Sequence, residues 1–282
     1  MTYAFFDIHA HVHDKQFDED REKLLRDMKE YGVGAITVGT DKIESSKALE
    51  LAKVHDHLYA SVGLHPADNV TELFDREYFE VLASHEKVVA IGECGLDYFY
   101  IETFFERDKE QKGLAWNKDA EADRQQRIFE EQIELAVFVN KPLMLHGRPS
   151  KGSMDAYEDM LHILEGAKKR HGNKLRGNAH FFVGDSEIAR RFIELGFTMS
   201  FSGVITFAHE YDDVVRYIPQ TMILAETDSP YVAPSPYRGQ RNNPLYVQEV
   251  VAKMSVLRNE PFEELRVKLL ENTERMFGIS LR

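Results

Sequence analysis

Short apolar runs alternate along the chain with longer stretches in which apolar residues recur at helical spacing. A short apolar run bounded by polar or turn-forming residues predicts a buried β-strand, and the helical spacing predicts an amphipathic helix. The predicted strands are residues 4–8, 35–38, 58–63, 88–92, 142–145, 177–182, 197–201 and 222–225. The helical stretches are residues 20–31, 45–54, 124–140, 154–170, 186–195 and 245–257. Helices that join successive strands give right-handed crossovers, so this order predicts an α/β fold with a parallel sheet.

The number of strands favours one parallel architecture over another. Eight strands with intervening helices are what a closed (β/α)8 TIM barrel requires. An open doubly wound sheet is the alternative, but it usually carries a glycine-rich phosphate loop after the first strand, where this chain reads Asp7-Ile-His-Ala-His-Val-His-Asp14. Since no linker or change of composition marks a boundary, we expect residues 1–282 to form a single barrel domain.

Three long connections follow predicted strands, at residues 99–123, 148–153 and 227–243. Connections after strands lie at the C-terminal face of a barrel, so we expect extended loops there. The first connection is interpreted as a lid or a decorated surface loop. Its aromatic residues Phe104, Phe105 and Trp116 either stack on a base or pack on the barrel, and packing is the favoured interpretation.

Charge and cysteine content limit the class of protein. With 35 basic and 48 acidic side chains the net charge is −13, which argues against a protein that coats nucleic acid but leaves room for a local basic or metal-lined cleft. The single cysteine, Cys94, cannot form an intrachain disulfide, so we expect a reducing, cytoplasmic location. No signal peptide or apolar run of about 18 residues is visible, so we expect no membrane association, and no obligate protein partner is inferred.

Metal-binding side chains recur where the predicted strands end. His9 and His11 are two positions apart, so both imidazoles point to one side of the sheet. Further candidates follow four other strands: Glu93, His146, His180 and Asp228. A barrel brings its strand ends to one mouth, and this set offers nitrogen and oxygen ligands without thiolate. The sequence therefore predicts a metal site at the mouth.

Other polar residues near these ligands are candidates for supporting roles. Glu226 precedes Asp228 by two residues and faces the same way in an extended chain, so we interpret it as orienting the loop or a ligand. We interpret His65, held in a turn before Pro66, as a contact to substrate phosphate, with a hydrogen bond to its own loop as the alternative. Forked phosphate donors are expected from arginines that follow two strands, with solvated surface side chains as the alternative: Arg148, Arg238 and Arg241.

Five motifs in chain order resemble those of the TatD family of metal-dependent hydrolases, TIM barrels of the amidohydrolase-like superfamily that include deoxyribonucleases. They are Phe6-Asp-Ile-His-Ala-His, Val62-Gly-Leu-His-Pro, Ile91-Gly-Glu-Cys-Gly-Leu-Asp-Tyr, Leu145-His-Gly-Arg and Glu226-Thr-Asp-Ser-Pro-Tyr. The resemblance implies two divalent ions, either Mg²⁺, Mn²⁺ or Zn²⁺. One ion would be held by His9, His11, Glu93 and Asp228, and the other by Glu93, His146 and His180. The resemblance also implies catalytic roles for Asp228, as general base, and for the bridging Glu93, and it supports Arg238 and Arg241 as substrate contacts.

The resemblance leads us to expect a hydrolase that cleaves single-stranded DNA as a 3′–5′ exonuclease, with a metal-activated water as nucleophile. Hydrolysis of aminoacyl esters or small phosphoesters is the enzymatic alternative. His180 is followed by Phe-Phe-Val-Gly where family members often show Cys-Phe-Ser-Gly, and His146 by Gly-Arg-Pro-Ser in place of the commoner Thr-Arg, so metal binding carries over more directly than nuclease activity. A metal-binding scaffold barrel is the non-enzymatic alternative, against which the intact ligand set argues.

Overall fold

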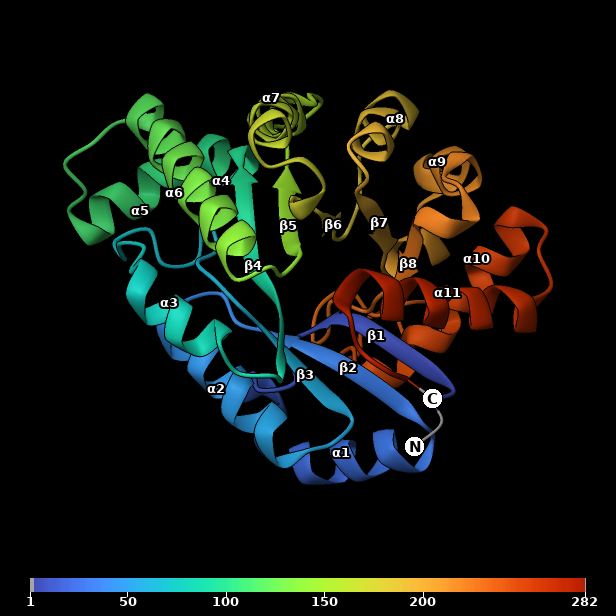
Figure 1. Cartoon of the computed structure of the whole chain (residues 1–282). Coiled ribbons are helices and arrows are strands. Elements are labelled where there is room, and N and C mark those ends of the chain that lie inside the picture. The colour runs from blue at the N-terminus through green and yellow to red at the C-terminus, as the bar shows by residue number, and fades with distance from the viewer. Residues whose placement is uncertain (1–2, 282) are drawn as a thin grey trace.

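The computed structural model describes residues 3–281 and contains an eight-stranded sheet in the order β1 to β8. Every neighbouring pair of strands is parallel. The strands are β1 (Phe5–Ala10), β2 (Val33–Val38), β3 (Leu58–Val62), β4 (Val88–Asp97), β5 (Leu143–Arg148), β6 (Gly177–Ala179), β7 (Thr198–Phe201) and β8 (Ile223–Ala225). Figure 1 shows helices around the outside of this curved sheet. The predicted (β/α)8 barrel is confirmed.

The first and last strands meet through a short seam that nearly closes the barrel. Ala10 and Ser229 form an isolated parallel bridge. The Asp228 N–H donates to the His9 carbonyl at 2.9 Å, and the His11 N–H donates to the Ser229 carbonyl at 2.7 Å. These bonds place His9 of β1 and His11, which directly follows it, beside the candidate ligand Asp228 that follows β8.

Helices connect the strands and cover the barrel: α1 (Arg21–Glu30), α2 (Lys42–Val54), α3 (Arg76–Ala83), α4 (Tyr98–Thr103), α5 (Phe105–Lys112), α6 (Lys118–Phe138), α7 (Asp155–His171), α8 (Ser186–Glu194), α9 (Asp212–Tyr217), α10 (Val247–Arg258) and α11 (Phe262–Phe277). Aspartates fix several helix starts, since Asp41 and Asp185 accept hydrogen bonds from the backbone three residues on. The six predicted helices are confirmed, whereas α3, α4, α5, α9 and α11 were not predicted.

The expectation of a loop at residues 99–123 is wrong. β4 continues to Asp97, whose side chain caps α4 by accepting from the Tyr100 N–H at 2.7 Å, and two short helices lead into α6. Helices of 6 and 8 residues are too short to show a clear helical apolar period among their many charges. Packing of the aromatics is confirmed: Phe105 is fully buried, and the partly buried Phe104 and Trp116 pack against the same core, with Trp116 Nε1–H also donating to Glu121.

The described residues include no helix long and apolar enough to cross a membrane. Apolar side chains instead form two buried clusters. The larger packs helices against strands, with Phe129, Phe192 and Phe201 among its fully buried members. The smaller joins strand residues such as Ile8 and Ile36 to residues at the end of α11. A closely packed apolar core thus supports the polar residues at the mouth of the barrel.

Candidate metal centre

Glu93 lies at the centre of the candidate site because β4 is irregular just before it. The pairing of β4 with β5 shifts register between Ile91 and Cys94. Gly92 adopts a φ of 142°, and a Cβ there would lie 2.3 Å from the Met144 carbonyl oxygen, so only glycine fits. Such a bulge redirects the side chain beside it. Glu93 is 4% exposed, and both its carboxylate oxygens face histidines.

One carboxylate oxygen, Glu93 Oε2, faces ligands from the two ends of the chain. His9 Nε2 lies 3.4 Å from it and His11 Nε2 lies 4.0 Å from it. Asp228 Oδ1 lies 3.7 Å from His9 Nε2 and 3.5 Å from His11 Nε2. An ion with bonds of about 2.1 Å requires its ligand atoms to be roughly 3.0 to 3.4 Å apart. We call this group the Oε2 half of the site. The distances between its ligand atoms are close to those expected around a bound ion.

The other oxygen, Glu93 Oε1, faces ligands from the two strands next along the barrel. His146 Nδ1 lies 2.8 Å from it and His180 Nε2 lies 2.7 Å from it. Glu93 and His146 belong to strands β4 and β5, and His180 directly follows β6. We call this group the Oε1 half. One carboxylate therefore connects two sets of ligands, as a residue shared by two ions would.

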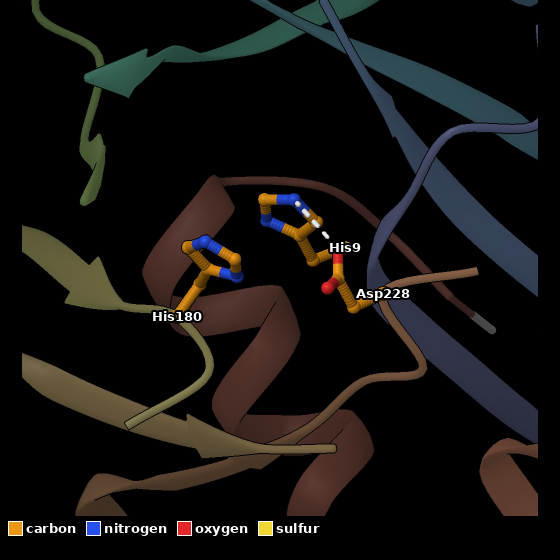
Figure 2. Close-up of side chains that lie close together, drawn as sticks. All are labelled: His9, His180 and Asp228. Carbon is orange, nitrogen blue, oxygen red and sulfur yellow. Dashed lines mark ion pairs between the residues drawn. The ribbon is translucent and has the colours of Figure 1, made fainter. Parts of the chain in front are cut away.

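Two histidine rings join the halves face to face. Figure 2 shows His9 between His180 and Asp228, and the His9 and His180 rings stack at 3.7 Å with an interplanar angle of 11°. His9 is fully buried, yet neither of its ring nitrogens has a hydrogen-bond partner among residues 3–281. An unpartnered buried nitrogen is costly, and a divalent ion would satisfy it. The residues present therefore fit a divalent metal, as their grouped ligand atoms also indicate.

In the Oε2 half, the two histidines differ in protonation. Burial, reinforced by the nearby His180, lowers the pKa of His9 to about 4 and keeps its imidazole neutral. Burial acts the same way on His11, but the hydrogen bond and charge of Asp228 outweigh it and raise the pKa of His11 to about 9. A metal ligand must be neutral, so His9 is ready to bind and His11 must lose a proton.

In the Oε1 half, Asp97 on β4 contacts the ring nitrogen of His146 that points away from Glu93. Asp97 Oδ2 lies 3.1 Å from His146 Nε2, opposite the nitrogen that faces Glu93. Burial alone would lower the pKa of His146, but Asp97 and Glu93 raise it to about 9. Burial would raise the pKa of Glu93, yet the charge of His180 and its neighbours holds it well below the ordinary value. Carboxylates that hold the far nitrogen of a ligand histidine fix its tautomer and orientation.

Glu226 plays the same part behind His180. It is fully buried, and its Oε1 lies 3.4 Å from His180 Nδ1 and accepts from the Phe181 N–H at 2.6 Å. Its Oε2 accepts from Ser200 Oγ at 2.5 Å, and Ser200 in turn accepts from Asn178. The interpretation of Glu226 as a residue that orients a ligand agrees with this geometry.

The sequence pattern placed the candidate ligands near strand ends, but two of the predicted strands were too short. Glu93 and His146 lie within β4 and β5 because these strands continue to Asp97 and Arg148, whereas β6 ends at Ala179. The prediction also missed Asp97. It lies four residues after Glu93, so in an extended strand both side chains face the same way, and this even spacing was the signal.

A cavity of about 780 Å³ opens above the candidate ligands, and His65 lines it. The hydrogen bond of His65 to its own loop is present, and it involves only one of the two ring nitrogens. Nδ1 accepts from the backbone N–H groups of Ala67 and Asp68, each at 3.2 Å, while Nε2 lies 3.7 Å from Glu93 Oε1. The loop thereby aims one edge of the ring into the site.

The three predicted arginine contacts are placed differently. Arg148 lines the cavity, and its guanidinium has no hydrogen bond or ion pair within the described part of the chain. Arg238 does not line the cavity; it donates to the Ala233 carbonyl and lies over a phenylalanine ring. Arg241 is also outside the cavity lining and pairs with Asp20 at 2.5 Å. Only Arg148 of the three therefore has its donors free at the cavity.

Comparison with known proteins gives matches over nearly the whole chain. The family model described as TatD related DNase matches residues 6–278. The uncharacterized metal-dependent hydrolase YabD of Bacillus subtilis is 37% identical over 280 residues, which cover 98% of this chain and 99% of the relative. The uncharacterized metal-dependent hydrolase YcfH of Escherichia coli is 38% identical over 232 residues, or 82% of this chain and 77% of that protein.

A solved structure agrees with these matches. The crystal structure of YJJV, a TatD homolog from Escherichia coli, aligns with a TM-score of 0.83 at 28% sequence identity. The alignment covers 99% of this chain and 100% of that protein. The likeness therefore includes the barrel and all the strands that carry the candidate ligands.

Proposed function

This chain belongs to the family of TatD-related DNases, whose relatives are metal-dependent hydrolases, and from this premise we propose that it hydrolyses phosphodiester bonds at the 3′ end of single-stranded DNA. The observation that carries the proposal is the Glu93 carboxylate, whose two oxygens face two separate ligand sets at the base of a cavity. A site of this form suits a reaction in which negative charge develops on a phosphate group.

The proposed ligand sets follow the two halves of the site. His9, His11, Asp228 and Glu93 Oε2 would hold one divalent ion; Glu93 Oε1, His146 and His180 would hold a second. When bound, such ions would supply a more acidic water and neutralise charge on the phosphate oxygens. Asp97 and Glu226 keep the histidines of the Oε1 half in place.

Asp228 is the proposed general base. Its Oδ1 faces His9 and His11, so Oδ2 remains to accept the proton of the attacking water. Its side chain is 16% exposed and lines the cavity, which gives water access to it. The backbone of Asp228 has a φ of 56° and is held to β1 by its N–H bond to His9, so the carboxylate is fixed in place.

His65 and Arg148 are the proposed contacts to the phosphate. The loop holds His65 Nδ1, which lies 3.2 Å from the Ala67 N and 3.1 Å from Asp68 Oδ1, so Nε2 is the nitrogen that faces the site and would meet a phosphate oxygen. The free guanidinium of Arg148 offers a fork of donors at the cavity rim. Arg238 and Arg241 are left out of this contact set because both are engaged elsewhere.

The test is digestion of end-labelled single-stranded DNA by metal-stripped protein to which Mg²⁺, Mn²⁺ or Zn²⁺ is restored separately. Stepwise loss from the 3′ end that requires added metal supports the proposal. The Asp228→Asn variant must lose this activity, which excludes a contaminating nuclease, while Asp213→Asn, whose side chain is 94% exposed on α9, must keep it and so controls for the effect of a substitution as such. Metal binding without DNA shortening contradicts the proposal and leaves small phosphoesters and aminoacyl esters to be assayed.

A further inference from the structure

A row of two phenylalanine rings with an arginine at each end leads out of the cavity along α4 and α5. The guanidinium of Arg148 lies 4.0 Å over the Phe99 ring. Phe99 meets Phe104 edge to face at 5.9 Å, and the guanidinium of Arg107 lies 5.2 Å from the Phe104 ring centre. We call these four residues the stacked row. Figure 1 shows α4 and α5 beyond the end of β4, beside α6.

The row is continuous with the cavity at one end and open to solvent at the other. Arg148 and Phe104 both line the cavity, whereas Arg107 lies outside it with a side chain 61% exposed. Arg107 pairs with Asp108 through Nε and Nη2, which leaves Nη1 available. A molecule that enters the cavity and is longer than the cavity passes along these side chains.

Neighbouring contacts hold the row in place. The backbone N–H of Lys151, in the loop that follows Arg148, donates to Glu102 Oε2 of α4 at 2.9 Å. Tyr98, at the start of α4, donates its hydroxyl to Asp159 of α7 at 2.7 Å. The loop after β5 and the helix after β4 are therefore tied together, and the stacking surface exists before any ligand binds.

We propose that the stacked row is a track for the single-stranded nucleic acid that extends from the cleaved nucleotide. This proposal rests on the proposed function and adds where the rest of the strand lies. Flat aromatic and guanidinium groups stack on bases of any sequence, and guanidinium donors contact the phosphates between them. In a chain of net charge −13, such a local row provides binding that bulk electrostatics does not.

The test measures binding and cleavage separately. Binding uses the metal-loaded full chain and a fluorescent single-stranded oligonucleotide of about 20 residues with hydrolysis-resistant phosphorothioate linkages, compared with a dinucleotide of the same chemistry. Phe104→Ala and Arg107→Ala are each expected to weaken binding of the long strand about five- to twentyfold and that of the dinucleotide less than about twofold.

The chain offers a matched control pair. Arg76 lies 5.4 Å over the ring of Phe138, which is 63% exposed, and neither residue lines the cavity. Phe138→Ala and Arg76→Ala should leave both affinities unchanged. Thermal unfolding of each variant checks that the barrel is intact.

Each outcome decides the proposal. Equal weakening of both ligands, or no weakening by either row variant, overturns the track even if the wild-type protein cleaves DNA. Absence of any binding to the long strand also overturns it. If the row variants bind the long strand weakly but the wild-type protein cleaves no phosphodiester, the track is supported and the proposed reaction is wrong.

Discussion

The Oε2 half and the Oε1 half of the site share one carboxylate but are assembled differently. In the Oε2 half the ligand atoms are 3.4 to 4.0 Å apart, which leaves space for an ion between them. In the Oε1 half His146 and His180 contact Glu93 directly at 2.8 and 2.7 Å. An ion entering the second half must replace two hydrogen bonds, so we expect the Oε2 half to bind its ion more tightly.

Different contacts hold the ligands of the two halves in place. The backbone seam between β1 and β8 positions the Oε2 half, through the bonds of His9 and His11 to Asp228 and Ser229. Side-chain carboxylates position the Oε1 half. Changes to single residues therefore affect the halves separately, unless they change the shared Glu93.

Glu93→Ala has the largest expected effect because it removes a ligand from both halves. We expect neither ion to be retained at micromolar metal and turnover to fall by more than about a thousandfold. Metal analysis after dialysis against buffered metal measures the loss. Glu194→Ala, at a side chain 59% exposed on α8, is the control. Retention of one full equivalent of metal would show that the carboxylate is not shared.

Asp228→Asn should separate chemistry from binding in the Oε2 half. The amide keeps an oxygen for the ion but cannot accept the water's proton, so we expect kcat to fall by about a hundred- to ten-thousandfold with most of the metal retained. Single-turnover assays with metal analysis test this. A wild-type rate in this variant would assign the base to another residue.

Glu226→Gln should weaken the Oε1 half alone. The amide is neutral, so the charge that faces His180 Nδ1 at 3.4 Å is lost, and its NH2 group meets Ser200 Oγ in place of an acceptor oxygen. His180 is then held less firmly. We expect about a ten- to hundredfold loss of affinity for one ion, measured by calorimetric titration of metal into stripped protein. Ser200→Ala, which removes a donor to Glu226 without touching His180, should give a smaller loss in the same half. Equal weakening of both ions would contradict the separation of the halves.

The smallest effect concerns protons. The Oε2 half contains one histidine with a raised pKa, His11 at about 9, whereas in the Oε1 half the pKa of His146 is raised to about 9 and that of His180 well above its ordinary value. Metal must displace these protons, so below pH 9 affinity should rise with pH by about tenfold per unit in the Oε2 half and by up to about a hundredfold per unit in the Oε1 half. Calorimetry in buffers of different ionisation enthalpy reports the protons released. His9, with a pKa lowered to about 4, should contribute none at neutral pH.

The fold and the positions of the candidate ligands were predictable because each rests on local sequence pattern. Eight apolar runs marked the strands, and every candidate ligand lies in or next to one of them. Glu93, His146 and His180 needed no knowledge of pairing, since a barrel brings all strand ends to one mouth.

What could not be predicted depends on contacts between distant segments. Arg241 was expected at the substrate, but it binds Asp20, which is far away in sequence and invisible to pattern. The stabilising role of Asp97 depends on the length of β4. This strand continues beyond the predicted apolar residues 88–92 as far as Asp97. The short helices of residues 98–112 form because Asp97 caps the first of them and Phe105 is buried beneath the second.

The seam between β1 and β8 also sets the order in which a newly made chain becomes competent. Ribosomes release the N-terminus first, so His9 and His11 are made long before Asp228. A nascent chain that ends before β8 holds the residues of only the Oε1 half in full. The proposed base is therefore the last residue of the two ligand sets to be translated.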